Sequence, residues 1–498
     1  MPAPDLRPAR TRAVRRRDPR LLAAALLLPL AASASDTGAV PDQATTPASV
    51  ASPSGPYALE TVLGPSLDGP GDTSDVQVRF GDAVAIDGDW MLVGVPERRG
   101  AGGQVRGAAF VFRRDAAGEW ETHQFLQFGA GGDARCGAAV ALSGRHAVIG
   151  CPGYSSEGLA ERGRTLVYYR NDDGLYVDPV TFLGSQAGAR CGHAVAAASW
   201  IAVGCIGQNT TGQSPARGEV ELYVQPELPP PFNPQLWINP GRLVYDANVV
   251  PGPAPFQMGF ALAIDRLDGV DRIAVGIPGT VNNSGMVRVF RRNPGDGLNW
   301  TFEYAGSLPG GPQTDARFGE RIALRGRLLN VGAPGADTRG RVHTYYLSPV
   351  TGAWSATGVI EPGTLPQHIN SGFGSALAFN GSELWIGQPG WRDASLVTRG
   401  RVLRYRAECS GPLCVPAYTY VDARSYSGSL MLSSAEFGSA LAADPGSGTL
   451  LIGAPRLGYG FPGGVSEGTL RRWGGVFSYR ADRLFANGFG SASAAVAD

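Results

Sequence analysis

The chain has 498 residues, including 71 Gly and 38 Pro, and its 43 basic residues balance its 43 acidic ones. Every basic residue in that count is an Arg, because the sequence contains no Lys, and this excludes the Lys-dependent chemistry of P-loops, Schiff bases and Ser-Lys dyads. A hydrophobic content of 43% can supply a large core, and the Gly and Pro content indicates many turns without reaching the level of a low-complexity chain.

The N-terminal segment has the pattern of an export signal. Residues 1–20 contain seven Arg and two Asp, residues 21–30 are apolar, and residues 32–34 (ASA) form a small-residue cleavage site. The apolar run is too short to span a membrane, and a buried helix is the weaker alternative. We therefore interpret residues 1–34 as a signal peptide, which predicts a secreted, periplasmic or cell-surface protein.

Cleavage of this segment would leave a mildly acidic chain. The remaining sequence has no basic run, which argues against nucleic-acid binding, and no later apolar segment of the ~20 residues that a membrane-spanning helix needs. Residues 35–55 are rich in Ala, Ser, Thr and Pro without periodicity, so we expect a flexible linker. We expect residues 483–498 to form a disordered tail.

Internal repetition is the strongest signal in the sequence. A short apolar block occurs seven times, with a Gly near its start and a Gly-x-Pro motif or a close variant at its end. Successive copies are separated by 55 to 67 residues. The first glycines of the copies are Gly81, Gly137, Gly192, Gly259, Gly319, Gly374 and Gly438.

Each copy predicts four antiparallel strands. In the first copy, apolar residues 83–86 and 91–93 flank an Asp-Gly-Asp turn, which is typical of a tight β-hairpin. A polar loop and a Gly then lead into an alternating strand at residues 107–112, and a fourth strand follows at residues 120–126. Four antiparallel strands in about 60 residues are the pattern of one β-propeller blade.

The strand count predicts how the ring closes. The seventh copy ends at residues 475–479 without a clear fourth strand, whereas residues 57–63 (YALETVL) precede the first copy as a strand without a partner. Their pairing would complete the seventh blade and cover its exposed edge. We predict an all-β fold: one seven-bladed β-propeller over residues 56–482, with four-stranded antiparallel blades and an N-terminal strand that completes the last blade.

The repeat resembles the FG-GAP family, which forms the N-terminal propeller of integrin α chains and occurs in many bacterial surface proteins. The resemblance covers all seven copies, and it implies a propeller fold and, among other functions, cell adhesion. Its functional specificity is poor, because propellers of this kind also serve as lectins and lyases. The matching motifs are Phe80-Gly81 with Gly94-Val95-Pro96, Phe318-Gly319 with Gly332-Ala333-Pro334, and Phe437-Gly438 with Gly453-Ala454-Pro455.

Six cysteines in an exported chain suggest disulfides. In copies two and three, one Cys replaces the residue before the first Gly, and a second Cys lies in the closing motif. The two substitutions occur only together, so each pair is expected to face across one hairpin. A zinc site is the weaker alternative, because no C-x-x-C cluster is present. The predicted pairs are Cys136–Cys151, Cys191–Cys205 and a local Cys409–Cys414.

Residues that could carry chemistry are few. His193 follows the first Gly of copy three and could face the central channel, although a packed polar residue is the simpler interpretation. Asp265, Asp268 and Asp271 surround one Gly and could bind calcium, with an acidic hairpin turn as the favoured alternative. We expect no other cofactor.

The loops between the second and third strands lie on one propeller face. The longest covers residues 456–474 in copy seven, and exposed aromatic residues beside Arg are typical of recognition sites. The alternative is that this loop plugs the channel. The candidate binding residues are Trp391, Arg392, Tyr459, Phe461, Arg471, Arg472 and Trp473.

We interpret the protein as an exported, non-enzymatic binding module that recognises a protein or glycan through these loops. The sequence has no H-E-x-x-H motif and no G-x-S-x-G nucleophile elbow. The alternative is a propeller enzyme of lyase or hydratase type that acts on carbohydrate in the central channel. A purely structural envelope component is a third interpretation.

Overall fold

The computed structural model describes residues 57–64, 77–100, 103–129, 132–209, 217–226, 236–244, 256–293, 302–309, 311, 313–408, 415–425, 435–457 and 472–481. All of them belong to one compact unit, Ala34–Asp498. The predicted signal peptide lies outside the described residues, as do the linker, the tail and the proposed Cys409–Cys414 bridge. Within the part of the chain that is described, no helix has the length and apolarity needed to cross a bilayer.

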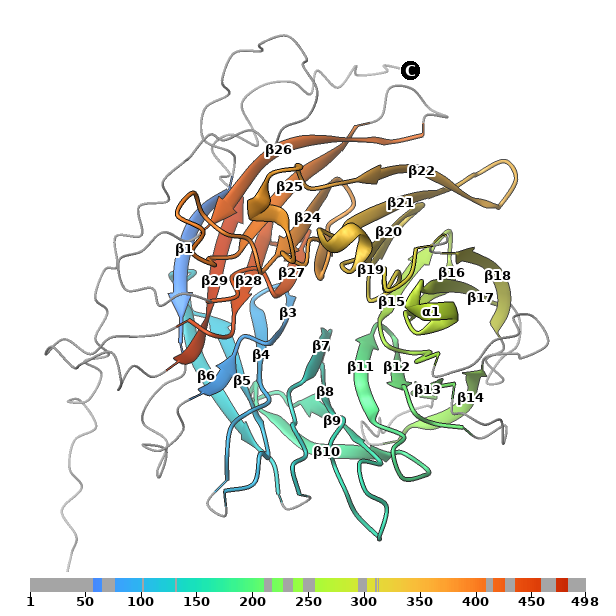
Figure 1. Ribbon diagram of the computed structural model, residues 1–498. Coiled ribbons are helices and arrows are strands. Elements are labelled where there is room, and N and C mark those ends of the chain that lie inside the picture. The colour runs from blue at the N-terminus through green and yellow to red at the C-terminus, as the bar shows by residue number, and fades with distance from the viewer. Residues whose placement is uncertain are drawn as a thin grey trace, which may run out of the picture. The chain divides into compact units, whose positions relative to one another are not determined.

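The described strands form seven sheets of four antiparallel strands each, one of them extended by a short parallel strand, and the sheets are arranged as the blades of a propeller (Figure 1). The predicted all-β propeller is therefore confirmed. The first three blades consist of β3 (Ala83–Asp87), β4 (Trp90–Val95), β5 (Ala108–Arg114) and β6 (Trp120–Gln127); β7 (Ala139–Ser143), β8 (His146–Cys151), β9 (Arg164–Arg170) and β10 (Tyr176–Leu183); and β11 (Cys191–Ala197), β12 (Trp200–Cys205), β13 (Glu219–Val224) and β14 (Ile238–Val244).

The next three blades repeat this order of strands. They consist of β15 (Leu262–Leu267), β16 (Val270–Ile277), β17 (Met286–Arg292) and β18 (Phe302–Pro309); β19 (Arg321–Arg325), β20 (Leu328–Ala333), β21 (Arg341–Leu347) and β22 (Trp354–Ile360); and β23 (Ala376–Phe379), β24 (Glu383–Gln388), β25 (Arg401–Glu408) and β26 (Ala417–Ser425). The described helices are single turns in loops: α1 (Thr280–Asn283), η1 (Ala336–Thr338) and η2 (Pro366–His368).

The seventh blade combines strands from both ends of the described chain. It contains β27 (Ala440–Asp444), β28 (Thr449–Ala454), β29 (Arg472–Ala481) and β1 (Tyr57–Leu63). Strand β1 pairs antiparallel with β29, so that Tyr57 lies opposite Ala481 and Leu63 opposite Val476. The short strand β2 (Gln77–Phe80) pairs in parallel with the start of β29. That β1 closes the ring remains a prediction, which is tested below.

Burial changes from strand to strand within a blade. All six residues of the second strands β12, β20 and β24 are buried, because these strands have neighbouring blades against both faces. The fourth strands are the outermost and mix buried with exposed residues, as β6 and β22 do. This gradient explains why the sequence signal is strongest in the first hairpin of each copy and weakest in the fourth strand.

The repeated glycines allow neighbouring blades to touch through their backbones. A Cβ atom on Gly94, in the closing motif of blade one, would lie 1.9 Å from the carbonyl oxygen of Gly137 in blade two. A Cβ on Gly453 in blade seven would lie 2.1 Å from the carbonyl oxygen of Gly81 in blade one. Any side chain at these positions would clash with backbone, so the contact requires Gly. The same contact thus recurs between the last blade and the first.

The two hairpin disulfides predicted from the repeat are present. Cys136 bonds to Cys151, and Cys191 bonds to Cys205. All four half-cystines are buried. In blade one the first of these positions holds Phe80, which is also fully buried. A disulfide therefore occupies, in two blades, a core position that an aromatic ring fills elsewhere.

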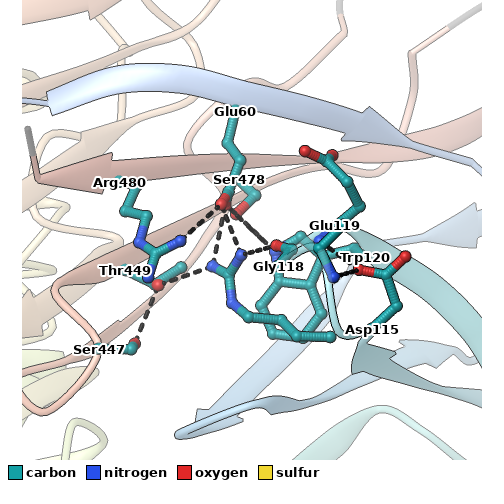
Figure 2. A network of polar contacts seen from close by, with 11 residues as sticks. Glu60, Asp115, Gly118, Glu119, Trp120, Ser447, Thr449, Ser478 and Arg480 are labelled. Atoms are coloured by element: carbon teal, nitrogen blue, oxygen red, sulfur yellow. Dashed lines mark hydrogen bonds and ion pairs between the residues drawn. The ribbon is translucent and has the colours of Figure 1, made fainter.

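A polar network joins β1 to blades one and seven (Figure 2). Glu60 accepts hydrogen bonds from Arg114 Nη2, at 3.0 Å, and from Ser478 Oγ, at 2.7 Å. Trp120 Nε1 donates to Ser478 Oγ at 3.0 Å, and Arg114 Nη2 donates to Thr449 Oγ1 at 3.0 Å. Burial alone would raise the pKa of Glu60, but the hydrogen bonds from Arg114 and Ser478 lower it below its ordinary value. Glu60 is therefore a carboxylate that connects three segments far apart in sequence.

Candidate functional site

A cavity of about 730 Å³ is lined by the innermost segments of all seven blades. Residues from the loops between second and third strands, such as Pro96 and Pro152, also line it. The cavity is therefore on the face that carries the predicted recognition loops. Residues that represent the seven blades in its lining are Asp82, Ala138, His193, Phe260, Arg321, Ala376 and Ser439.

A strained turn directs side chains into this cavity. The residue three positions before Asp82, and the residue at the equivalent position of each other blade, has a left-handed backbone, with φ of 57° at Arg79 and 51° at Arg190. Its carbonyl accepts a hydrogen bond from the amide three residues on, as Arg190 does from His193 at 3.2 Å. A left-handed non-Gly residue costs free energy, so its recurrence in register indicates a blade-level role. The equivalent left-handed residues in the other blades are Arg135, Gln257, Arg317, Gly372 and Glu436.

Several of these arginines form ion pairs with neighbouring carboxylates. Arg190 Nη2 lies 2.6 Å from Glu161 Oε2, and Arg79 Nη1 lies 3.6 Å from Glu436 Oε2. Both pairs join one blade to the preceding one in the ring. These arginines therefore have structural contacts between blades, although the pairs are partly exposed and each contributes little stability on its own.

Charge is unevenly distributed around the cavity. The described lining from the first two blades contains four carboxylates, Asp82, Glu97, Asp133 and Glu161, together with Arg135, which lies 4.0 Å from Glu97. The described lining from blades three to five contributes Arg190, His193 and Arg321 and no carboxylate. We call these two parts of the lining the acidic side and the basic side.

His193 lines the cavity on its basic side. The sequence had allowed it to face the channel, with a packed polar residue as the simpler interpretation. Its ring packs against Phe260 with 4.5 Å between ring centroids. Burial, followed by the nearby Arg321, Arg190 and Arg317, lowers the pKa of His193 to about 4. The imidazole is therefore neutral at pH 7.

A second feature of the same face is formed by two loops of blade six. We define the blade-six patch as Leu365, Ile369, Trp391, Arg392 and Leu396. The two loops are bonded through Arg392 N, which donates to the Gln367 carbonyl at 3.4 Å. The aliphatic members are 46%, 45% and 57% exposed, and Arg392 is also exposed.

Trp391 has a contact within its own blade that the sequence did not reveal. The guanidinium of Arg401 lies 4.9 Å from the centroid of its ring, and Trp391 is half-buried. Blade two repeats this arrangement, with Arg164 stacked 4.1 Å from the ring centroid of Tyr154. The aromatic residue after the closing motif thus has a packing role, and only part of its ring remains available to a ligand.

For the other predicted binding residues, the structure describes either nothing or only the backbone. Tyr459, Phe461 and Arg471 lie outside the described residues. Arg472 and Trp473 begin β29, of which only the backbone is described at these two positions. Their role in binding remains a prediction.

The three aspartates proposed for calcium each have a protein partner. Asp265 Oδ2 accepts a hydrogen bond from the Gly326 amide at 2.7 Å, Asp268 Oδ2 lies 2.8 Å from Arg327 Nη2, and Asp271 pairs with Arg292. Among the described residues, no group of three His, Cys, Asp or Glu side chains is placed to hold a metal ion. These contacts favour the hairpin-turn interpretation, and calcium binding remains untested.

Sequence reasoning did not find Phe260 and Arg321 as cavity residues. Their positions relative to the first Gly of each copy could have identified them. Phe260 directly follows that Gly, as His193 does, and Arg321 lies one residue further along. Register alone does not show which of the seven side chains share one side of the channel.

Comparison with known proteins supports the repeat. A sequence model of the FG-GAP repeat matches residues 71–112. No curated protein sequence matches the chain. Among solved structures, the periplasmic gluconolactonase of Pseudomonas aeruginosa is similar at 17% identity and a TM-score of 0.40, covering 70% of this chain and 88% of that one.

Two further solved structures are similar in the same way. Saccharomyces cerevisiae Sqt1 has 9% identity and a TM-score of 0.44, covering 82% of this chain and 97% of that one. The WD40 repeats of RRP9 have 10% identity and a TM-score of 0.43, covering 84% of this chain and 100% of that one.

Proposed function

The chain is an FG-GAP β-propeller, and from this premise we propose that it is an exported, non-enzymatic binding module that recognises a protein ligand on its loop face. The observation that carries the proposal is the blade-six patch. Three exposed aliphatic side chains lie there on two loops that are hydrogen-bonded through Arg392 N. Exposed apolar residues with a polar border are typical of protein-binding surfaces.

The patch fits a protein better than a glycan. Sugar recognition relies on an exposed aromatic face, whereas the Trp391 ring is half-buried and stacked on Arg401. Leu365, Ile369 and Leu396 instead offer exposed aliphatic area, and burial of this area against an apolar partner would be favourable.

The disulfides support export. Cys136–Cys151 and Cys191–Cys205 are buried bonds of a kind that persists in oxidising compartments. Together with residues 1–34, they favour a secreted, periplasmic or cell-surface protein.

An enzyme acting in the channel is the weaker proposal. His193 is the cavity's titratable ring, and its pKa of about 4 makes it a weak base at neutral pH. Efficient general acid–base catalysis needs a pKa near the working pH.

The test uses the mature chain, residues 35–498, with its disulfides intact. The chain would be applied to an array of purified extracellular-matrix and cell-surface proteins and of glycans. We expect saturable binding to at least one protein, weakened about tenfold or more by a Leu365→Ser and Ile369→Ser double substitution, because a buried aliphatic side chain contributes about 1.5 kcal/mol or more.

Val350→Ser is the matched control. Val350 is 79% exposed in the turn between β21 and β22, and such turns lie at the opposite end of the blade from the loops that follow the second strands. It should leave binding unchanged. Equal loss in both variants, binding to glycans alone, or no binding to any protein would overturn the proposal.

A further inference from the structure

The basic side of the central cavity has an arginine without an acidic partner. Arg321 is the first residue of β19, lines the cavity, and donates from Nη1 to the Glu320 carbonyl at 2.8 Å. Across the described residues, no carboxylate lies within ion-pair distance of its guanidinium. Its neighbours differ, because Arg190 pairs with Glu161 and Arg317 pairs with Glu320.

Two aromatic rings, those of His193 and Phe260, line the cavity on the same side as Arg321. His193 and Phe260 pack with 4.5 Å between centroids, and the Arg317 guanidinium lies 5.5 Å from the Phe260 centroid. His193, Phe260 and Arg321 come from blades three, four and five. Three arginines act on His193: Arg321, Arg190 and Arg317. Arg190 and Arg317 are each paired with a carboxylate, so Arg321 is the one of the three whose charge has no acidic partner among the described residues.

The opposite side offers hydrogen-bond acceptors. Asp133 and Glu97 line the cavity, and Asp133 Oδ1 accepts from the Val105 amide at 2.7 Å, which leaves its second oxygen available. Carboxylate oxygens facing a cavity are suited to the hydroxyl groups of a ligand. A volume of about 730 Å³ is ample for a small molecule.

We propose that the central cavity binds a small hydroxylated carboxylate, a sugar acid, whose carboxylate pairs with Arg321 and whose hydroxyl groups face Asp133 and Glu97. The guanidinium offers paired donors that match a carboxylate. His193, neutral at pH 7, donates a hydrogen bond to the same ligand, and the Phe260 ring packs against its carbon skeleton. This site is separate from the blade-six patch, and the ligand it takes is bound without a chemical step.

The experiment is calorimetric titration of the mature chain with galacturonate as the probe. Galactose, which has no carboxylate, and inorganic phosphate, which has no hydroxylated skeleton, are the comparison ligands. We expect galacturonate to bind at millimolar or lower concentration and at least tenfold more tightly than either, because only galacturonate combines a hydrogen-bonded charge pair with hydroxyl contacts.

Arg321→Gln should weaken galacturonate binding about tenfold or more, and Arg325→Gln is its matched control. Arg325 ends the same strand and is exposed, and it does not line the cavity. Melting temperatures of both variants would be compared with the unmodified chain. Since the comparison of ligands uses the unmodified chain, it remains decisive even where Arg321→Gln does not fold.

Three outcomes would overturn this inference: equal affinity for galacturonate and galactose, equal affinity for galacturonate and phosphate, or no binding of galacturonate at millimolar concentration. Unchanged binding in a folded Arg321→Gln variant would do the same. None of these results bears on the blade-six patch, whose test uses a different ligand and different residues.

Discussion

At the scale of single residues, His368 shows how the fold controls a titratable group. The ring is 3% exposed, Gln388 Nε2 donates to its Nδ1 at 2.9 Å, and Ser371 and Arg401 complete the cluster. Burial, followed by Arg401 and Arg339, lowers the pKa of His368 from 6.5 to about 4. Below pH 6.5 the unfolded chain binds a proton that the folded protein does not. The contribution of His368 to stability is therefore complete above pH 6.5 and is lost as pH falls towards 4.

Replacement of this ring should flatten the acid side of the stability profile. In His368→Asn, the amide oxygen can accept the Gln388 hydrogen bond at the place of Nδ1 but does not titrate. The fall in unfolding free energy from pH 7 to pH 4.5 should shrink, by up to about 3 kcal/mol. Urea unfolding at several pH values measures it. The same slope in both proteins would contradict the assignment.

At the scale of elements, two equivalent positions of the first hairpin hold a disulfide in one blade and two apolar side chains in another. Blade two links Cys136 to Cys151, whereas blade one has Phe80 and Val95 at the same two positions. Phe80 packs edge-on against Phe110, with 5.5 Å between ring centroids. The glycine contact to the next blade is the same in both cases: a Cβ on Gly94 would lie 1.9 Å from the Gly137 carbonyl oxygen, and one on Gly150 would lie 2.0 Å from the Gly192 carbonyl oxygen.

Removal of one disulfide should therefore destabilise the protein moderately. Cys136→Ala with Cys151→Ala should lower the unfolding free energy by about 2–4 kcal/mol. Cys136→Phe with Cys151→Val should recover part of this loss, because blade one packs those residues. Denaturant unfolding of the three proteins, with and without reductant, measures the effect. If the Phe and Val pair were less stable than the two alanines, the equivalence of the blades would be wrong.

At the scale of the whole molecule, Glu60 connects strands from the two ends of the described chain. Its carboxylate hydrogen-bonds to Arg114 in blade one and to Ser478 in blade seven (Figure 2). The Arg114 side chain is only 3% exposed. Loss of one partner from a buried ion pair leaves an uncompensated charge, which is more costly than the pair itself is stabilising.

The closing role of β1 can be tested through this carboxylate. Glu60→Ala should lower the unfolding free energy by about 3–5 kcal/mol, whereas Glu121→Ala, at an exposed site on β6, should change it by less than about 0.5 kcal/mol. Calorimetric or denaturant unfolding of both variants gives the comparison. If Glu60→Ala matched the control, β1 would be an attached strand without a role in closure.

The sequence determined the propeller fold because the motifs that specify a blade are local and occur seven times along the chain. Each Gly contact, each hairpin and each pair of cysteines lies within one copy or at a fixed register between copies, so one chain reveals them without an alignment. The disulfides could be predicted for the same reason. Cys136 and Cys151 occupy the two motif positions that face each other across the first hairpin of every copy.

Only the tertiary structure decided which side chains share a site. His193, Phe260 and Arg321 are more than 60 residues apart from one another in sequence, and they meet because the ring brings three blades to one side of a cavity. The stacking of Trp391 on Arg401 likewise depends on side-chain packing. Charge and exposure at a site arise from long-range packing, which no local periodicity encodes.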